Sequence, residues 1–349
     1  MLQNLPSESV KKRAIVLGAA GYSGAELVRI LHRHPFMHLV AAYASEGRVA
    51  EPFSSLYPRF HQQVDLLVEP WSDTHLAGLA ERADVAFLAL PHEASEQLAP
   101  KLLDAGVTVF DLSGAFRLKN PALYPEFYGY EHQHATYLAQ APYGLAEWIT
   151  REELAQSLFA VAGCYPTASS LALLPLIQHQ LLAEQAVPVI SAVSGVSGAG
   201  RKASLATSFC EVGLAAYGFF SHRHRPEIEQ CLGRSVVFTP HLGNFKRGIL
   251  ATIVVTLAEN VSQAQVEAAF QHSYQHKPLV RLVHKSPNVA DVAGTPFCDL
   301  FWQQQGQQLV IVAAIDNLLK GASAQAIQLA NLKYQWPETA GLLAGGDDE

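Results

Sequence analysis

Hydrophobic and polar positions in the first half of the chain alternate between short β-branched runs and longer stretches with helical spacing. Four apolar runs have the pattern of buried strands, at residues 13–17, 38–43, 85–90 and 107–112. Helical spacing follows the first run over residues 25–34 and separates the last two over residues 93–105. Strands that alternate with helices in this way predict a parallel, doubly wound α/β sheet.

The pattern changes after about residue 150, where a long apolar helix is expected over residues 168–182. β-rich runs follow at residues 187–193, 235–239, 249–257 and 309–315. Between them we expect helices around residues 201–214 and over 263–275. This order predicts an α+β domain with a mixed, mostly antiparallel sheet. A last helix over residues 318–334, rich in small side chains, is expected to pack back on the first domain.

The length of 349 residues also suggests two domains, since domains average roughly 150 residues. We place the first at residues 1–163, completed by the C-terminal segment 318–349, and the second at residues 164–317. With 49% hydrophobic and 16% charged residues, and no apolar run near the roughly 18 residues that span a bilayer, the composition excludes a membrane protein. The net charge of −7, without a basic stripe, argues against nucleic acid as a partner.

Residues 1–13 are polar and lack the apolar core of a secretory signal, so we expect a cytoplasmic protein. The four cysteines lie far apart and form no C-x-x-C pair, so neither a disulfide framework nor a zinc site is expected in that reducing compartment. The H-x-H pairs have no third ligand nearby in the sequence, and we predict no metal.

A glycine turn joins the first expected strand to the first helix. Its residues are Gly18, Gly21 and Gly24, with Tyr22 and Ser23 between the last two. Glycines spaced three apart let the backbone bend tightly and approach a pyrophosphate, which the N-terminus of the following helix attracts. Glycine-rich turns also occur without ligands, so the motif alone is weak evidence for a dinucleotide.

The end of the second expected strand distinguishes NAD from NADP. An NAD site places an acidic residue there, whereas an NADP site supplies an uncharged residue and a cation. Ser45 could donate to a 2′-phosphate and Arg48 could neutralise it, which favours NADP(H). Glu46 lies between them, and an ordinary solvated loop is the alternative interpretation.

Two further segments could contact a cofactor. A second glycine turn contains Ser194, Gly195, Ser197 and Gly198, and suits backbone contact with a cofactor or a phosphate; a plain loop is the alternative. Asn317 follows the last β-rich run and could offer its amide to the nicotinamide carboxamide, or Asp316-Asn317 could cap the helix that follows.

Cys164 is the best nucleophile candidate among the four cysteines. It lies between an apolar strand and a helix, and a helix N-terminus favours the thiolate. A lowering of its pKa by roughly two units would make the thiolate the majority form at pH 7. The alternative is a cysteine that only packs, which is what we expect of the other three.

A basic segment around residue 224 supplies candidate acid/base groups. Histidine titrates in the range that a cysteine nucleophile needs. In an extended segment His222 and His224 would point to one face, and Arg223 and Arg225 to the other. Either histidine could then reach Cys164, although a solvated basic turn is the alternative.

Five blocks together make the chain resemble the N-acetyl-γ-glutamyl-phosphate reductases, a family related to the aspartate-semialdehyde dehydrogenases. The blocks are residues 18–24 (GAAGYSG), 163–168 (GCYPTA), 194–201 (SGVSGAGR), 222–228 (HRHRPEI) and 316–322 (DNLLKGA). They span nearly the whole chain in the expected order. Ala162 departs from the family pattern, in which many members have proline before the Gly-Cys pair, and we expect an altered turn with unchanged chemistry.

The resemblance implies a Rossmann-like NADP-binding domain at residues 1–163 and 318–349, and a catalytic and dimerisation domain at residues 164–317. The implied reaction is the reversible NADPH-dependent reduction of N-acetyl-γ-glutamyl phosphate to N-acetylglutamate semialdehyde and phosphate, in arginine biosynthesis, by a homodimer or homotetramer. Cys164 would form a thioester, with His222 as acid/base and His224 as its rival. The candidates for binding the substrate's anionic groups are Arg117, Arg201, His224, Lys246 and Arg247.

Three other functions are weighed against this one. A homologous lysine-pathway reductase would act on a longer or carrier-linked acyl phosphate, but a strongly acidic carrier needs an exposed basic face that the scattered basic pairs do not provide. A non-catalytic nucleotide sensor would require an inert Cys164. A simple hydroxy-acid dehydrogenase would not need that cysteine at all.

Overall fold

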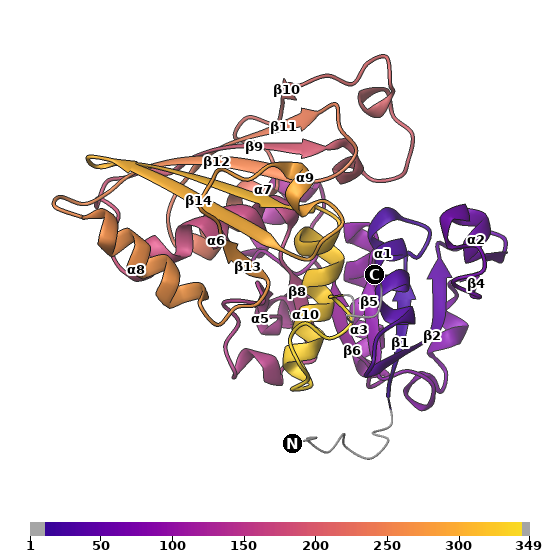
Figure 1. Ribbon diagram of the computed structural model, residues 1–349. Coiled ribbons are helices and arrows are strands. Elements are labelled where there is room, and N and C mark those ends of the chain that lie inside the picture. Colours follow the sequence, from indigo (N-terminus) through magenta and orange to yellow (C-terminus); the bar gives the residue numbers. More distant parts are fainter. Residues whose placement is uncertain (1–10, 344–349) are drawn as a thin grey trace, which may run out of the picture.

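The computed structural model describes residues 11–343, which form two β-sheets with helices packed around them (Figure 1). The expectation of a cytoplasmic protein came from residues 1–13, and residues 1–10 of that segment lie outside the described residues. So do residues 344–349, at the end of the expected first domain.

The first sheet has eight strands in the order β3-β4-β2-β1-β5-β6-β8-β7, and every neighbouring pair is parallel except β3 and β4. The strands are β1 (Lys12–Leu17), β2 (Met37–Ala44), β3 (Glu51–Pro52), β4 (Leu67–Pro70), β5 (Val85–Leu88), β6 (Thr108–Asp111), β7 (Tyr143–Gly144) and β8 (Leu158–Val161). Central strands such as β5 are buried along their whole length, because helices cover both faces of a parallel sheet.

Helices on opposite faces of the first sheet bury two separate apolar clusters. One cluster joins the sheet to α1 and to the returning C-terminal helix α10, and the other joins it to α3, α4 and α5. The helices are α1 (Tyr22–His32), α2 (Phe53–Leu56), α3 (His92–Asp104), α4 (Tyr124–Tyr128), α5 (Ala135–Gln140) and α10 (Ala324–Lys333).

The second sheet has seven strands in the order β10-β11-β9-β12-β15-β14-β13. The pairs β9–β11 and β13–β14 are parallel and the other four are antiparallel. The strands are β9 (Val189–Gly195), β10 (Ala215–Ala216), β11 (Val237–Gly243), β12 (Ile249–Thr256), β13 (Val280–Leu282), β14 (Cys298–Gln305) and β15 (Gln308–Ile315). The predicted fold class, a parallel doubly wound sheet plus a mixed, mostly antiparallel one, is confirmed.

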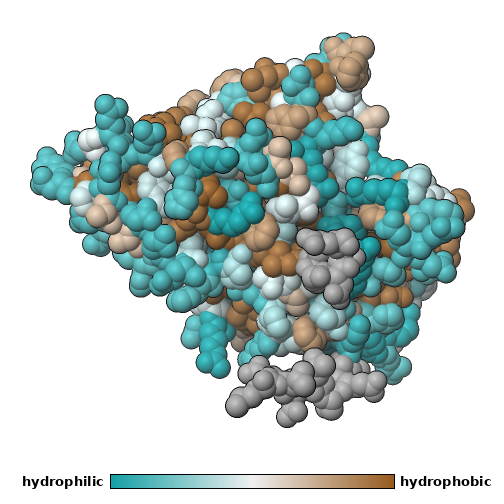
Figure 2. Space-filling view, in the orientation of Figure 1, coloured by the Kyte–Doolittle hydropathy of each residue, from teal (hydrophilic) through white to brown (hydrophobic). Residues whose placement is uncertain are grey.

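The second sheet buries one face only. Along β12 buried residues alternate with more exposed ones, and the buried set packs against α6, α7 and α8. The helices are α6 (Cys164–Gln178), α7 (His224–Leu232), α8 (Gln263–Tyr274) and α9 (Val289–Val292). The open face carries exposed valines, and Figure 2 shows apolar side chains in brown across the upper part of the molecule, where β9, β10 and β11 lie.

Two crossings connect the sheets. The chain leaves β8 through Gly163 and enters α6 at Cys164, and it returns from β15 through a π-helical turn, Leu319–Ser323, into α10. In Figure 1 the yellow α10 lies between the second sheet and the indigo α1 and β1. The two cavities that concern the function lie near these crossings.

Four local expectations were wrong. Residues 201–214 form no α-helix but only a 3₁₀ turn, Leu205–Thr207, because nearly all of these residues are exposed and a helix there would have no face to bury. The helix expected from residue 168 begins at Cys164 and ends at Gln178. The last helix opens with the π-helical turn. The segment before α7 is not extended, since Arg223 has helical backbone angles.

Short 3₁₀ segments complete the described elements, at Pro58–Phe60, Asp73–Leu76, Leu79–Glu81, Pro121–Leu123, Glu153–Ala155 and Val196–Ala199. Within residues 11–343 no helix is long and apolar enough to cross a membrane.

Candidate active site

Cys164 is the first residue of α6, and Gly163 is the N-cap. The Gly163 carbonyl accepts hydrogen bonds from the Thr167 N–H at 2.8 Å and from the Thr167 hydroxyl at 2.8 Å, which closes the first turn of the helix. On its other side Cys164 packs against Gly321 of the π-helical turn, where an added Cβ would lie 2.7 Å from Cys164 Cβ. The nucleophile candidate therefore lies between the two chain crossings.

Burial opposes the thiolate that the helix N-terminus favours. It raises the pKa of the Cys164 thiol to about 11, and the nearby charges of Arg117 and Arg223 offset this only in part. The expectation of a lowered pKa took account of the helix N-terminus but not of the burial of the Cys164 thiol. In this structure the thiol needs a base to remove its proton.

Cys164 opens into a cavity of about 770 Å³ at the edge of the second sheet. The polar and titratable side chains that line it with Cys164 are Tyr165, Ser194, Glu211, Tyr217, Ser221, His222, Arg223 and His224. The structure thus brings the candidate nucleophile and both candidate acid/base groups into one space, although they are about 60 residues apart in the sequence.

The two histidines have different surroundings. His222 Nδ1 accepts a hydrogen bond from the His224 N–H at 3.1 Å, and the Tyr217 hydroxyl lies 3.5 Å from His222 Nε2. Burial and the charge of Arg223 lower the pKa of His222 to about 4. His224 is more deeply buried, and burial followed by the charge of His222 lowers its pKa further below the usual range. Both rings are neutral at pH 7.

Glu227 of α7 lies directly beneath the Gly163–Cys164 turn, and our sequence analysis missed it. Its Oε1 accepts hydrogen bonds from the Gly163 N–H at 2.7 Å and the Tyr143 hydroxyl at 2.8 Å, and its Oε2 lies 4.0 Å from His224 Nε2. Its place three residues after His224, within the block at residues 222–228, was the available signal. Glu227 orients the nucleophile turn and one histidine.

Arg117 supports the same turn from the first sheet. Its Nη1 pairs with Glu227 Oε2 at 3.4 Å, Nε donates to the Val161 carbonyl at 2.8 Å, and Nη2 donates to the Leu112 carbonyl at 2.7 Å. The side chain is only 6% exposed and does not line the cavity. Its donors hold the ends of two strands and a carboxylate together.

The glycine turn is compact enough to admit a pyrophosphate. Gly18 has a φ of +88°, and an added Cβ would overlap the Ala89 carbonyl oxygen; at Gly24 it would overlap the Gly18 carbonyl oxygen. Gly21 is the N-cap of α1, and Tyr22 and Ser23 are its first two residues. A backbone without side chains at the N-terminus of a helix fits the phosphates of a dinucleotide.

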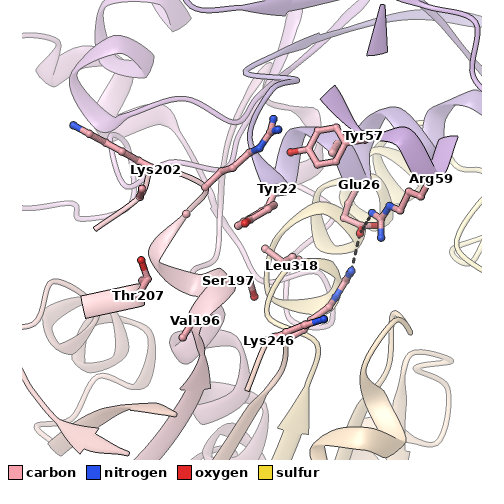
Figure 3. Close-up of a pocket in the computed structure, with 15 residues that line it drawn as sticks. Tyr22, Glu26, Tyr57, Arg59, Val196, Ser197, Lys202, Thr207, Lys246 and Leu318 are labelled. Carbon is pink, nitrogen blue, oxygen red and sulfur yellow. Dashed lines mark hydrogen bonds and ion pairs between the residues drawn. The ribbon is translucent and has the colours of Figure 1, made fainter. Parts of the chain in front are cut away.

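A second cavity, of about 510 Å³, separates the glycine turn from the second sheet (Figure 3). Tyr22, Tyr57 and Arg59 line it from the first sheet's side, and Ser197 and Lys246 from the other. It lies on the opposite side of the second glycine turn from the Cys164 cavity, since Ser197 lines one cavity and Ser194 and Gly198 line the other.

Three of the candidate substrate residues lie at this second cavity and not beside Cys164. Arg201 donates to the carbonyls of Ala20 at 3.0 Å and Leu56 at 3.1 Å, with its guanidinium 4.7 Å from the Tyr57 ring centre. Arg247 pairs with Glu26 at 2.7 Å and with Asp316, and Lys246 lines the cavity beside it.

The remaining cofactor candidates are placed as follows. Ser45 and Arg48 are exposed after β2, and Arg48 pairs with Glu51 at 3.9 Å. Asn317 donates to Ser197 Oγ at 3.0 Å and accepts the Gly248 N–H at 2.6 Å, so it joins the crossing after β15 to the second glycine turn and to the start of β12. Gly195 lies against the backbone at Arg247, where a Cβ would come within 2.6 Å of the Arg247 backbone nitrogen.

Within the described residues no group of three or more metal-ligating side chains could hold a metal ion.

Comparisons with known proteins agree with this architecture. A family model for the NAD-binding domain of semialdehyde dehydrogenases matches residues 13–157, and one for their dimerisation domain matches residues 164–317. The N-acetyl-gamma-glutamyl-phosphate reductase of Tolumonas auensis is 52% identical over 94% of this chain and 99% of its own length. The enzyme of the same name from Pasteurella multocida is 52% identical over 95% of this chain and 100% of its own.

Solved structures share the fold at low sequence identity. Aspartate semialdehyde dehydrogenase II of Vibrio cholerae superposes with a TM-score of 0.71 at 16% identity, covering 94% of this chain and 99% of its own. The aspartate semialdehyde dehydrogenase of Candida albicans, solved with NADP, gives 0.61 at 14% identity, covering 92% and 98%.

Proposed function

The chain belongs to the N-acetyl-γ-glutamyl-phosphate reductase family, and we propose that it reduces N-acetyl-γ-glutamyl phosphate to N-acetyl-L-glutamate 5-semialdehyde and phosphate, as a step of arginine biosynthesis. The observation that carries the proposal is the cavity in which Cys164 meets His222 and His224, next to a glycine turn that suits a dinucleotide.

In the proposed mechanism Cys164 is the nucleophile. His222 is neutral and lines the cavity, so it can take the thiol proton as the sulfur attacks the acyl carbon. The carbon–sulfur bond forms, the carbon–oxygen bond to phosphate breaks, and a thioester remains. A bound nicotinamide cofactor supplies the hydride that reduces this thioester.

The protonated His222 then returns its proton. Reduction would give the tetrahedral alkoxide of a thiohemiacetal on Cys164. Its collapse to the aldehyde breaks the carbon–sulfur bond, and the released sulfur regains the proton that His222 holds. His224 is a weaker candidate for this role, because its more buried ring faces Glu227 beneath the turn. Glu227 and Arg117 act as positioning residues, since they hold the turn and do not line the cavity.

We propose NADP(H) as the cofactor. A nicotinamide cofactor is what the NAD-binding domain takes, and the preference for the phosphorylated form rests on Ser45 and Arg48 at the end of β2. Both are exposed there, and Arg48 has only a long ion pair to give up for a 2′-phosphate. We also propose a homo-oligomer, because the second sheet leaves one face open within the domain that matches a dimerisation domain.

The test is phosphate-dependent NADPH formation from N-acetylglutamate semialdehyde and NADP. We expect activity in the intact protein, a loss of at least roughly 1,000-fold in Cys164→Ala, and little change in Cys210→Ala, whose cysteine is exposed and outside the cavity. The same assay with NAD in place of NADP tests the cofactor preference.

Activity that survives Cys164→Ala would remove the thioester mechanism and leave a simple dehydrogenase. Activity that needs no phosphate would show that the oxidised product is not an acyl phosphate, and absence of activity in all proteins would favour another substrate or a sensor.

A further inference from the structure

The Cys164 cavity contains a single permanent cation. Among the described residues that line it, Arg223 is the only lysine or arginine. His222 and His224 are uncharged at neutral pH, because burial lowers the pKa of both imidazoles. Glu211 contributes a carboxylate to the wall, and no ion pair joins it to Arg223 within the described residues. An anionic substrate that enters this space therefore meets one fixed positive charge.

Within residues 11–343 the donors of Arg223 have no partner, whereas those of the neighbouring arginines are occupied. Arg117 donates to two backbone carbonyls and pairs with Glu227. Arg225 donates to Glu229 at 3.2 Å and to the Phe220 carbonyl at 3.3 Å. The exposed side chain of Arg223 makes no hydrogen bond or ion pair with any described residue.

Arg223 lies close to the atoms that react. It precedes the first residue of α7, between the two histidines. Its charge favours the thiolate of Cys164 and disfavours protonation of His222, so its field reaches both. Arg223 lines the same cavity as Cys164 and both histidines.

We propose that Arg223 binds the phosphoryl group of the acyl phosphate, and inorganic phosphate in the reverse reaction; this inference rests on the proposed function. As the Cys164 sulfur bonds to the acyl carbon, the bond from that carbon to the phosphate oxygen breaks and its electron pair leaves with phosphate. Arg223 stabilises that departing charge. A guanidinium fork matches two phosphate oxygens, and its contribution grows as negative charge develops.

The position of Arg223 favours the phosphate over the substrate's α-carboxylate. The phosphate oxygen is bonded directly to the carbon that the sulfur attacks. The carbon of the α-carboxylate is four carbon–carbon bonds away from that acyl carbon. A cation that lines the cavity with Cys164, between the two histidines in the chain, is therefore placed for the nearer anion.

The experiment measures the KM of the full-length enzyme for inorganic phosphate and, separately, for N-acetylglutamate semialdehyde, in Arg223→Gln, Arg223→Lys and the intact protein. We expect Arg223→Gln to raise the KM for phosphate by roughly 10- to 100-fold, the range for a lost charged hydrogen bond. The KM for the semialdehyde should stay within about twofold of the intact value. Arg223→Lys should recover part of the phosphate affinity, because it restores the charge without the fork.

Arg225→Gln is the matched control. It removes a guanidinium two residues away that pairs with Glu229 and does not line the cavity, so both KM values should stay unchanged. Because Arg223 is exposed, Arg223→Gln should melt at the same temperature as the intact protein. If Arg223→Gln is destabilised, the KM values of Arg223→Lys provide an independent test.

The other outcomes distinguish a failure of the role of Arg223 from a failure of the proposed function. A raised KM for the semialdehyde with an unchanged KM for phosphate would overturn the inference and assign Arg223 to the carboxylate. Two unchanged KM values would overturn it as well. If the intact protein showed no phosphate-dependent activity, the proposed function would fail first, and the inference would fail with it.

Discussion

Cys164 is subject to two opposing influences at the scale of a single side chain. The first turn of α6 favours its thiolate, while burial raises the pKa of the thiol to about 11. With that pKa, roughly one molecule in 10,000 carries the thiolate at pH 7. The neutral imidazole of His222, in the same cavity, provides a base for the thiol proton when substrate binds.

The pH dependence of alkylation reports this balance. A raised pKa means that the thiolate fraction of Cys164 increases about tenfold per pH unit throughout the range from 7 to 10. The rate of Cys164 carbamidomethylation by iodoacetamide, followed by peptide mass spectrometry, should rise with that slope. A rate that levels off below pH 8 would mean that the helix N-terminus outweighs burial.

The π-helical turn Leu319–Ser323 links both halves of the site at the scale of an element. Its i→i+5 hydrogen bonds run from the Gly321 N–H to the Asp316 carbonyl at 2.9 Å and from the Ser323 N–H to the Leu318 carbonyl at 3.0 Å. Gly321 packs on Cys164, and the Ser323 hydroxyl donates to the Ser23 carbonyl in α1 at 2.8 Å. One turn therefore contacts the nucleophile helix and the glycine-turn helix.

A buried ion pair anchors this turn. Lys320 is fully buried, pairs with Glu147, and donates to Gln328 Oε1 at 2.7 Å. Gln325 Nε2 donates to Thr167 Oγ1 at 3.3 Å and so ties the turn to the first turn of α6. These contacts leave Gly321 little freedom to move away from the cysteine.

Gly321→Ala should impair catalysis more than stability. The new Cβ would lie 2.7 Å from Cys164 Cβ and 3.1 Å from Cys164 Cα, so the nucleophile must shift. We expect kcat to fall at least roughly tenfold, as for a misplaced reacting group, and the free energy of unfolding to fall by about 1–3 kcal/mol. Steady-state kinetics and urea denaturation measure the two effects.

Ala322→Gly is the control in the same turn. It loosens the backbone by about 1 kcal/mol without adding an atom near Cys164. An equal loss of kcat in both variants would show that a weakened turn, and not the overlap with Cys164, is responsible.

Periodicity predicted the elements of the first sheet because buried strands and amphipathic helices carry repeating patterns. It could not predict the π-helical turn, since one extra residue per turn leaves no recognisable period in a segment of only five residues. It also failed at residues 201–214, where scattered apolar residues suggested a helix that has no surface to bury. Tertiary context decides both cases.

Tertiary context also limited what the sequence could predict about the candidate active site. Cys164, His222 and His224 were found from local chemistry, and the structure gathers them in one cavity. Arg117, Arg201 and Arg247 have suitable chemistry, but their donors are occupied. Apart from the Leu112 carbonyl, five residues from Arg117, the partners are 44 to 221 residues away in the sequence. No local pattern distinguishes a free guanidinium from an occupied one.

At the scale of the whole molecule, ion pairs and hydrogen bonds join the two sheets across the second cavity. Arg247 pairs with Glu26 of α1 and with Asp316 after β15. Glu26 is only 2% exposed and also pairs with Arg29 and Arg59. Arg201 adds two hydrogen bonds to backbone carbonyls of the first domain.

Arg247→Met should weaken the association of the two domains. It removes the ion pair to Glu26 of the other domain and leaves the buried carboxylate of Asp316 without its ion-pair partner. We expect the free energy of unfolding to fall by about 3–5 kcal/mol. Chemical denaturation measures this change. Arg29→Met, which removes a more exposed partner of Glu26 within one helix, should cost at most about 1 kcal/mol, and equal effects would contradict a role between domains.

The two chain crossings meet where Gly321 touches Cys164, and this arrangement has a mechanical meaning. Two covalent links that meet at one place define a hinge, and in any rotation about a hinge each atom moves in proportion to its distance from the axis. The cysteine lies at the pivot, whereas Arg201 and Lys246 line the second cavity, which does not include Cys164. A bulky dinucleotide could thus enter and leave through a widening rim while the sulfur stays almost still.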